Sequence, residues 1–262
     1  MTLTTLTWAQ MREVERRLTE THGVTLLQRI EVAGRALAQT ARHLLAGHVE
    51  EKEIVVLAGT GPKGAAGLAA ARHLHEEGAQ VRVVLSSPSA ALNEMAAHQY
   101  ALLRDMGLDA WGLSLTQEQM AAQEPIRWTE AALLIDALLE PELERDPTGE
   151  PAELIRLINA TRRPILSFDA PSGLSGDEGF ILSPCIDAIA TLTLALPKRG
   201  LIEGWPVVGE LWLADLGVPP ALYRSMGLEV ADPFNGKIIV SLGPARMVGR
   251  GADDRRPTTD DR

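Results

Sequence analysis

The sequence has few residues of several kinds, and each shortage excludes a class of protein. Among its 262 residues is a single cysteine, Cys185, so the chain can form neither an internal disulfide nor a cysteine metal cluster. Aromatic residues make up 4% of the chain, which disfavours a base-stacking surface for single strands. No apolar run approaches the roughly 20 residues that span a bilayer, and the first residues lack a secretory-signal pattern. We therefore expect a cytoplasmic protein that binds no membrane.

Lysine is scarce as well. Only four of the 25 basic residues are lysines, namely Lys52, Lys63, Lys198 and Lys237. The 35 acidic residues leave a net charge of -10, and phosphate backbones are bound by clustered Lys and Arg. We therefore expect no nucleic-acid partner, and a lysine beside a candidate site merits attention.

Apolar patterning predicts alternating strands and helices after two initial helices. We expect helices over 9–20, 26–46, 67–77, 90–106 and 150–161, and strands over 54–58, 81–85, 132–136, 164–168, 188–196 and 207–213. This order is typical of a mostly parallel sheet covered by helices on both faces, an α/β fold of three layers. We predict one domain over 1–243. Residues 244–262, charged and nearly free of large apolar residues towards the end, are expected to be a disordered tail.

In such sheets ligands bind beyond the carboxyl ends of the strands, where one candidate is the glycine-rich segment 59–67. Gly59, Gly61 and Gly64 fit the dinucleotide pattern G-x-G-x-x-G, but the next strand ends in serines and lacks the acid that normally accompanies this pattern. The segment is either a phosphate-binding loop, with the following helix N-terminus offering N–H groups, or a tight strand–helix turn without a ligand.

Three further segments follow strands. Asp136 closes one strand as a ligand or as a helix N-cap. Asp169, before a Pro-Ser-Gly turn, is either a proton-transfer group or part of an Asx turn. The basic segment 197–200, which contains Lys198, is a fourth candidate or a solvated turn.

The four segments in this order resemble the NAD(P)H-hydrate epimerase family, also called the YjeF N-terminal domain or apolipoprotein A-I binding protein family. The residues that carry the resemblance are Met11-Arg12-Glu13, Ala33-Gly34-Arg35, Gly67–Leu74, Asp136-Ala137, Asp169–Leu174 and Pro197–Gly200. The resemblance implies a three-layer, Rossmann-like α/β/α sandwich that interconverts the R and S epimers of hydrated NADH and NADPH, and a homodimer. It implies that Asp169 is the acid–base group and that potassium is bound by a loop asparagine, Asp136 and Ser172.

The glycine-rich loop departs from the family pattern N-N-G-G-D-G. Here it reads Pro62-Lys63-Gly64-Ala65-Ala66-Gly67, so that Lys63 stands where the family has its potassium-binding asparagine. Its ammonium could take the place of the ion between Asp136 and Ser172, or it could point into water from an exposed loop. A distance above about 6 Å between the Lys63 nitrogen and the Asp136 carboxylate would exclude the first alternative.

A second departure follows Asp136, where the family has a phosphate-contacting G-T-G-L run. Glu140 and Glu142 occur there, and carboxylates would repel a pyrophosphate. By resemblance the substrate-binding residues are Gly59, Gly61, Lys63, Gly64, Ala65, Ala66, Gly67, Glu140, Leu143 and Lys198. Two hypotheses remain: a divergent epimerase that keeps Asp169, or a module that lost the reaction and binds a nicotinamide-dinucleotide-like molecule or a protein. A dehydrogenase would rest on the G-x-G-x-x-G pattern alone.

Overall fold

The computed structural model describes residues 3–108, 110–112 and 126–248, which are built around a central sheet. Its strand order is β10-β9-β8-β5-β4-β1-β2-β3, and every pair is parallel except β9 with β10. The strands are β1 (Glu53–Ala58), β2 (Gln80–Leu85), β3 (Ala110–Gly112), β4 (Leu133–Ala137), β5 (Ile165–Phe168), β8 (Ala190–Leu194), β9 (Glu210–Ala214) and β10 (Ile239–Pro244). A separate short hairpin pairs β6 (Leu174–Ser175) with β7 (Phe180–Ile181).

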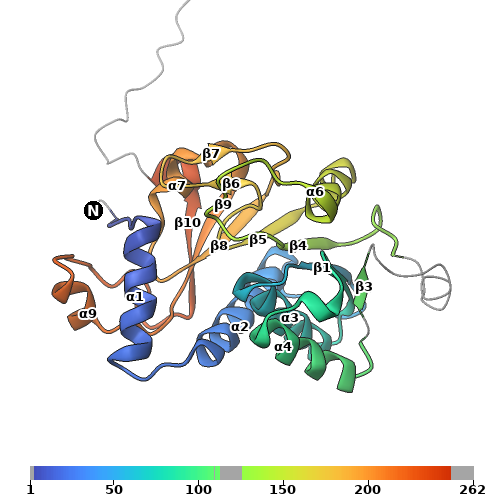
Figure 1. The fold of residues 1–262 in the computed structure, drawn as a ribbon, viewed down its shortest axis with the longest axis horizontal. Coiled ribbons are helices and arrows are strands. Elements are labelled where there is room, and N and C mark those ends of the chain that lie inside the picture. The colour runs from blue at the N-terminus through green and yellow to red at the C-terminus, as the bar shows by residue number, and fades with distance from the viewer. Residues whose placement is uncertain (1–2, 109, 113–125, 249–262) are drawn as a thin grey trace, which may run out of the picture.

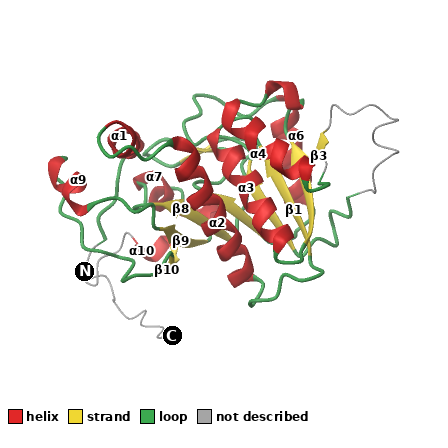
Figure 2. Cartoon of the chain, turned by 90° about the horizontal axis from the view of Figure 1, so that it is seen from below, coloured by secondary structure: helices red, strands yellow, loops and turns green. Residues whose placement is uncertain are grey.

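Helices cover both faces of this sheet, as Figures 1 and 2 show. One face carries α2 (Leu26–Leu44), α3 (Pro62–Glu76) and α4 (Glu94–Asp105), and α6 (Gly149–Ala160) lies on the other. The remaining helices are α1 (Trp8–Glu20), α7 (Arg199–Glu203), α8 (Trp205–Val208), α9 (Pro220–Ser225) and α10 (Ala245–Val248), with a 3-10 turn at Ser89–Ala91. The predicted three-layer α/β/α fold is thus confirmed. Within the described ranges, no helix is both long and apolar enough to cross a membrane.

The central strands are buried on both faces, which explains their continuous apolar sequences. Along β1, Ile54 and Val56 join the core beneath α2 and α3, whereas Val55 and Leu57 join the core beneath α6. This alternation follows from the two-residue period of a strand. Packing against helices on both sides therefore fixes the register of β1 in the middle layer.

Two capping boxes start the first helices. The Thr7 hydroxyl accepts a hydrogen bond from the backbone N–H of Gln10, whose side chain accepts one from the Thr7 N–H. Thr25 and Gln28 make the same pair of bonds at the start of α2. Because each box satisfies two backbone N–H groups that have no partner within the helix, the sequence defines where α1 and α2 begin.

The structure differs from the sequence prediction at α3, which begins at Pro62 instead of residue 67. Pro is favoured in the first helical position because it has no N–H to leave unpaired and its φ suits a helix. The segment expected to be a loop is therefore largely the first turns of α3. The prediction of helix over 90–106 is also too long, since α4 begins at Glu94 after the N-cap Asn93.

The C-terminal part differs as well. The predicted strand 207–213 begins too early, because Trp205–Val208 forms α8 and β9 starts at Glu210. The predicted tail also begins too early: β10 runs through Pro244 and α10 follows. Ala245 is only 1% exposed in a small apolar cluster with Val248, so burial orders this part. Residues 249–262 of the predicted tail lie outside the described residues.

The strand order places a topological switch between β1 and β4. From β1 the chain proceeds to β2 and β3 on one side, and from β4 it proceeds to β5, β8 and β9 on the other. Loops diverge at such a switch and leave a crevice at the carboxyl ends of the strands. The glycine-rich segment and the residues after β4 and β5 lie at this position, which is where a site is expected.

Candidate active site

Asp136, at the carboxyl end of β4, is fully buried and hydrogen-bonded on both carboxylate oxygens. Oδ1 accepts from the Ser172 hydroxyl at 2.6 Å and from the Leu138 N–H at 3.2 Å. Oδ2 accepts from the Ser167 hydroxyl and from the Ser172 N–H, both at 2.8 Å. Such a set of donors satisfies the oxygens of a buried carboxylate. Asp136 thereby fixes the turn after β5 relative to the end of β4.

Lys63 reaches the same point from the first turn of α3. Its ammonium donates to the carbonyl oxygens of Leu139 at 2.9 Å and Ala170 at 2.7 Å, and to the Ser172 hydroxyl at 3.1 Å. Its nitrogen lies 3.8 Å from Asp136 Oδ2, and its side chain is 2% exposed. The distance is below the 6 Å limit set from the sequence, and the alternative of a lysine pointing into water is wrong.

A potassium ion does not fit this cluster in addition to Lys63. The oxygens that would hold an ion between Asp136 and Ser172 already accept the ammonium protons. Two unit charges about 3 Å apart repel by about 5 kcal/mol at an effective dielectric constant of about 20. In the part of the chain that the structure describes, no group of three or more His, Cys, Asp or Glu side chains could hold a metal. The residues of this cluster therefore do not fit a potassium ion while Lys63 occupies it.

Asp169 lies directly after β5 and is held by a second buried lysine. Its Oδ1 accepts from Lys198 Nζ and from the Thr193 hydroxyl, both at 2.9 Å. The Lys198 ammonium also donates to Thr193 Oγ1 and to the Leu194 carbonyl, and it lies 5.4 Å from the centre of the Trp8 ring. Lys198 is 0% exposed whereas Asp169 is 19% exposed, so the cation is inside and the carboxylate reaches the surface of the site.

The backbone at Asp169 has an unusual conformation. Its φ is +60°, in the left-handed region that residues other than glycine rarely adopt. Its N–H donates to the Leu192 carbonyl at 2.7 Å, and the next N–H returns to the Phe168 carbonyl at 2.8 Å. Backbone conformations of this kind are concentrated at functional sites. These contacts favour a positioned side chain over an incidental turn.

A small cavity of about 70 Å³ adjoins Asp169. It is lined by residues of α1, α2 and α3 and by the ends of the strands, including Glu15, Arg29, Lys63, Glu140 and Asp169. Arg29 and Glu15 face each other with 3.5 Å between their nearest charged atoms. The cavity is smaller than typical ligand sites, which occupy about 300–1,000 Å³.

Glu140 places its carboxylate at the N-terminus of α3. Its Oε1 accepts from the Lys63 N–H at 2.9 Å, at the position where a helix end favours an anion. Burial raises the pKa of Glu140 above its usual value, in part offset by the Lys63 N–H. Burial likewise raises the pKa of Glu15 on the opposite wall, against the charge of Arg29. The site therefore holds two carboxyls whose ionisation is disfavoured.

The glycine-rich segment is explained by close packing. A Cβ on Gly59 would lie 1.9 Å from the Leu138 carbonyl oxygen, and one on Gly64 would lie 2.0 Å from the Gly59 oxygen. On Gly67 it would lie 2.6 Å from the Cβ of Ala137. Close packing within the β1–α3 turn and against the end of β4 therefore requires glycine at 59, 64 and 67. Two of the three glycines of the G-x-G-x-x-G pattern are thus accounted for without a dinucleotide, whereas a Cβ on Gly61 would meet only the side chain of Glu140.

The predicted site residues fall into two connected groups. Lys63, Asp136 and Ser172 form one, and Asp169 with Lys198 forms the other. Ala66 and Glu140 line the cavity, whereas Gly59, Gly61, Gly64, Ala65 and Gly67 build the turn and first helical turns beside it. Leu143 is not brought to the cavity; its carbonyl accepts from Ser175. Glu142 is also outside, paired with Arg12 on the surface.

Four residues of the site were missed by the sequence analysis. Ser167 and Thr193 hold the two aspartates, and each is a hydroxyl residue between apolar neighbours on a buried strand, a signal that could have been used. Glu15 and Arg29 come from α1 and α2. Nothing in their local sequence shows that these helices pack over the carboxyl ends of the strands.

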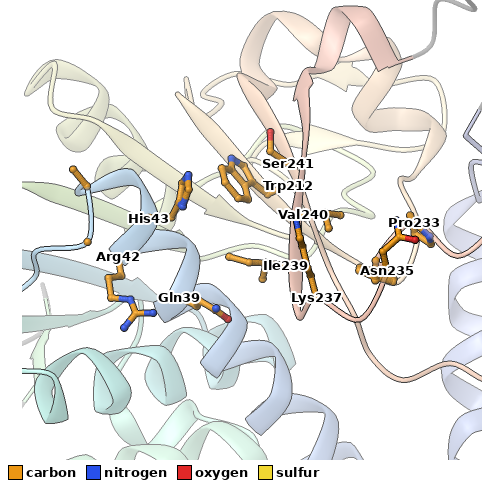
Figure 3. Close-up of a pocket in the computed structure, with 13 residues that line it drawn as sticks. Gln39, Arg42, His43, Trp212, Pro233, Asn235, Lys237, Ile239, Val240 and Ser241 are labelled. Carbon is orange, nitrogen blue, oxygen red and sulfur yellow. The ribbon is translucent and has the colours of Figure 1, made fainter.

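A larger cavity of about 960 Å³ lies between α2 and the strands β9 and β10, as Figure 3 shows. Its lining includes Arg42, His43, Trp212, Lys237 and Ser241. Cationic side chains near the C-terminus of α2 are favoured there by the helix dipole. None of the four segments predicted from the sequence contributes to it, so the candidate site is the small cavity at Asp169.

Known proteins resemble this chain over most of its length. The family described as YjeF-related protein N-terminus matches residues 26–200. An NAD(P)H-hydrate epimerase of Dehalogenimonas lykanthroporepellens is 37% identical, covering 92% of this chain and 93% of that protein. The epimerase of Truepera radiovictrix is 34% identical, covering 84% and 93%.

A bifunctional NAD(P)H-hydrate repair enzyme of Salinibacter ruber is 36% identical over 82% of this chain, which spans 41% of that enzyme. The crystal structure of the yeast protein ynu0 superposes with a TM-score of 0.71 at 21% identity, covering 92% of this chain and all of that chain. It therefore shares the fold. These matches agree with the resemblance carried by the four segments. The chain belongs to the family of YjeF-related protein N-termini, together with NAD(P)H-hydrate epimerases.

Proposed function

We propose that this chain is an NAD(P)H-hydrate epimerase that interconverts the R and S forms of hydrated NADH and NADPH. The observation that carries the proposal is the Asp169 carboxylate, held at the wall of a cavity by a buried lysine. The relatives named as epimerases support the substrate class, since two of them match this chain over nearly their whole length.

Asp169 is the acid–base group of the proposed reaction. Both of its hydrogen bonds end on Oδ1, and among the described residues none is found on Oδ2, which is left to exchange a proton with the substrate. Lys198 is a positioning residue, because its ammonium donates to Asp169 Oδ1 and to Thr193, whose hydroxyl donates to the same carboxylate oxygen. A positioned acid–base group typically contributes about 10²- to 10⁴-fold to a rate.

Substrate entry requires a change at the cavity. A volume of about 70 Å³ does not hold a dinucleotide, and the wall formed by Glu15 and Arg29 belongs to α1 and α2 rather than to the sheet. We infer that these side chains move apart when the reacting ring enters. Glu140 occupies the anion position at α3, so the substrate phosphates bind elsewhere or displace this carboxylate.

The test is conversion of one purified epimer of hydrated NADPH by the wild-type chain, followed by chromatographic separation of the epimers. Formation of the other epimer well above the spontaneous rate supports the proposal. Absence of conversion, together with a rise in melting temperature on adding NADP, would contradict the epimerase and support a module that binds a nicotinamide dinucleotide. Absence of both the conversion and the rise in melting temperature would also contradict the binding of a nicotinamide dinucleotide.

A further inference from the structure

We propose that the Lys63 ammonium is a built-in cation at the junction of α3, β4 and β5, and that it makes this site independent of monovalent metal ions. The disagreement between the potassium implied by the family resemblance and the donor set around Lys63 leads to this inference. It concerns the site of the proposed function but does not rest on catalysis, since its readout is stability.

The ammonium uses all of its hydrogens. Its three acceptors, the carbonyl oxygens of Leu139 and Ala170 and the hydroxyl of Ser172, lie at 2.7–3.1 Å. An ammonium has three donors and no acceptor, so the number of partners matches the number of protons. The side chain is 2% exposed, which leaves no room for water to take the place of these oxygens.

The acceptors belong to segments that are far apart in sequence. Leu139 follows β4, Ala170 and Ser172 follow β5, and the lysine itself is in α3. A single cation therefore ties three elements together at the switch point of the sheet. An alkali ion bound by carbonyl and hydroxyl oxygens would join the same loops. Here the cation is part of the Lys63 side chain, so it cannot dissociate into solvent.

The charge of Lys63 also balances Asp136. The carboxylate is 0% exposed, and the ammonium nitrogen is 3.8 Å from its Oδ2. Ser172 connects them by accepting from Lys63 and donating to Asp136. A buried carboxylate without a cationic partner is strongly unfavourable. The cation is therefore needed at this place whether a lysine or a metal supplies it.

The test compares melting temperatures in potassium chloride and in choline chloride at equal ionic strength. Choline is too large to take the place of the Lys63 ammonium among these oxygens. The wild type is expected to melt at the same temperature in both salts. Lys63→Asn removes the ammonium and leaves an amide oxygen as a ligand. In choline chloride we expect this variant to melt at a lower temperature than the wild type does. We expect potassium at ten times its dissociation constant to raise the melting temperature of Lys63→Asn by about 3–6 °C.

Two further variants complete the design. Lys63→Met fills the space without a charge, and we expect it to melt lower than the wild type in both salts without rescue by potassium. Lys52→Asn removes an exposed lysine and controls for the loss of a lysine charge elsewhere: we expect it to behave as the wild type does in both salts. A wild-type melting temperature that is higher in potassium chloride than in choline chloride, by more than the difference seen with Lys63→Met, would overturn the proposal. A Lys63→Met protein as stable as the wild type, or a folded Lys63→Asn protein that potassium does not stabilise, would also overturn it.

Discussion

Replacing Lys198 by Met tests how the site holds Asp169. Met keeps an apolar chain beside Trp8 but removes the ammonium, which donates to Asp169, Thr193 and the Leu194 carbonyl. Deleting one partner of a buried ion pair costs about 3–5 kcal/mol, because the other charge is left uncompensated. Asp169 is 19% exposed, so water offsets part of this cost. We therefore expect the free energy of unfolding to fall by about 3 kcal/mol, near the lower end of this range.

For a chain of this size, a loss of about 3 kcal/mol lowers the melting temperature by about 6–12 °C. Urea unfolding measures the same change as a lower midpoint at a similar slope. Lys52→Met is the matched control: Lys52 is exposed, and we expect its effect to stay within about 0.5 kcal/mol. A Lys198→Met protein within 0.5 kcal/mol of the wild type would refute the assignment of Lys198 as a buried partner of Asp169.

Two further predictions follow from the raised pKa values. Because the folded pKa of Glu140 lies above the ordinary 4.5, the folded state binds more protons there, and the contribution of Glu140 to wild-type stability declines as pH rises from about 4.5 through the folded value. Glu140→Gln keeps an acceptor for the Lys63 N–H, so its stability relative to the wild type should grow over that window in urea titrations; a pH-independent difference would contradict this. Burial raises the pKa of Cys185 from 9.0 to about 12, so iodoacetamide should alkylate it about 1,000-fold more slowly at pH 8 than an unperturbed thiol; alkylation at the rate of a small thiol would contradict this burial.

The central strands of the sheet could be predicted from the sequence because they are buried on both faces, whereas the edge strands β3 and β10 were not predicted. Continuous apolar runs such as Ile54–Ala58 are the direct result of that burial. The start of α3 was missed for a physical reason: glycines lower the intrinsic helix preference, and here Gly64 and Gly67 are required by contact with the preceding turn and with the end of β4. Tertiary packing thus outweighed local preference.

The candidate site was predictable in part. The position of Asp136 and Asp169 after parallel strands placed both at one edge of the sheet, and the structure brings Lys63 and Lys198 to them. From the sequence, Lys63 could be either buried or exposed, because its segment was expected to be a loop. In the structure this segment is the first turn of α3, which directs Lys63 to Asp136. Glu15 could not be assigned to the site, since the placement of α1 depends on packing between distant segments.

The central claim is that Asp169 carries out proton transfer in this chain. The most direct measurement is the rate of epimerisation of hydrated NADPH by Asp169→Asn, below its melting temperature, beside the wild type and the exposed-site control Asp105→Asn. The account predicts that Asp169→Asn loses about 10²- to 10⁴-fold in rate, while Asp105→Asn retains the wild-type rate. A folded Asp169→Asn protein that epimerises as fast as the wild type would contradict it.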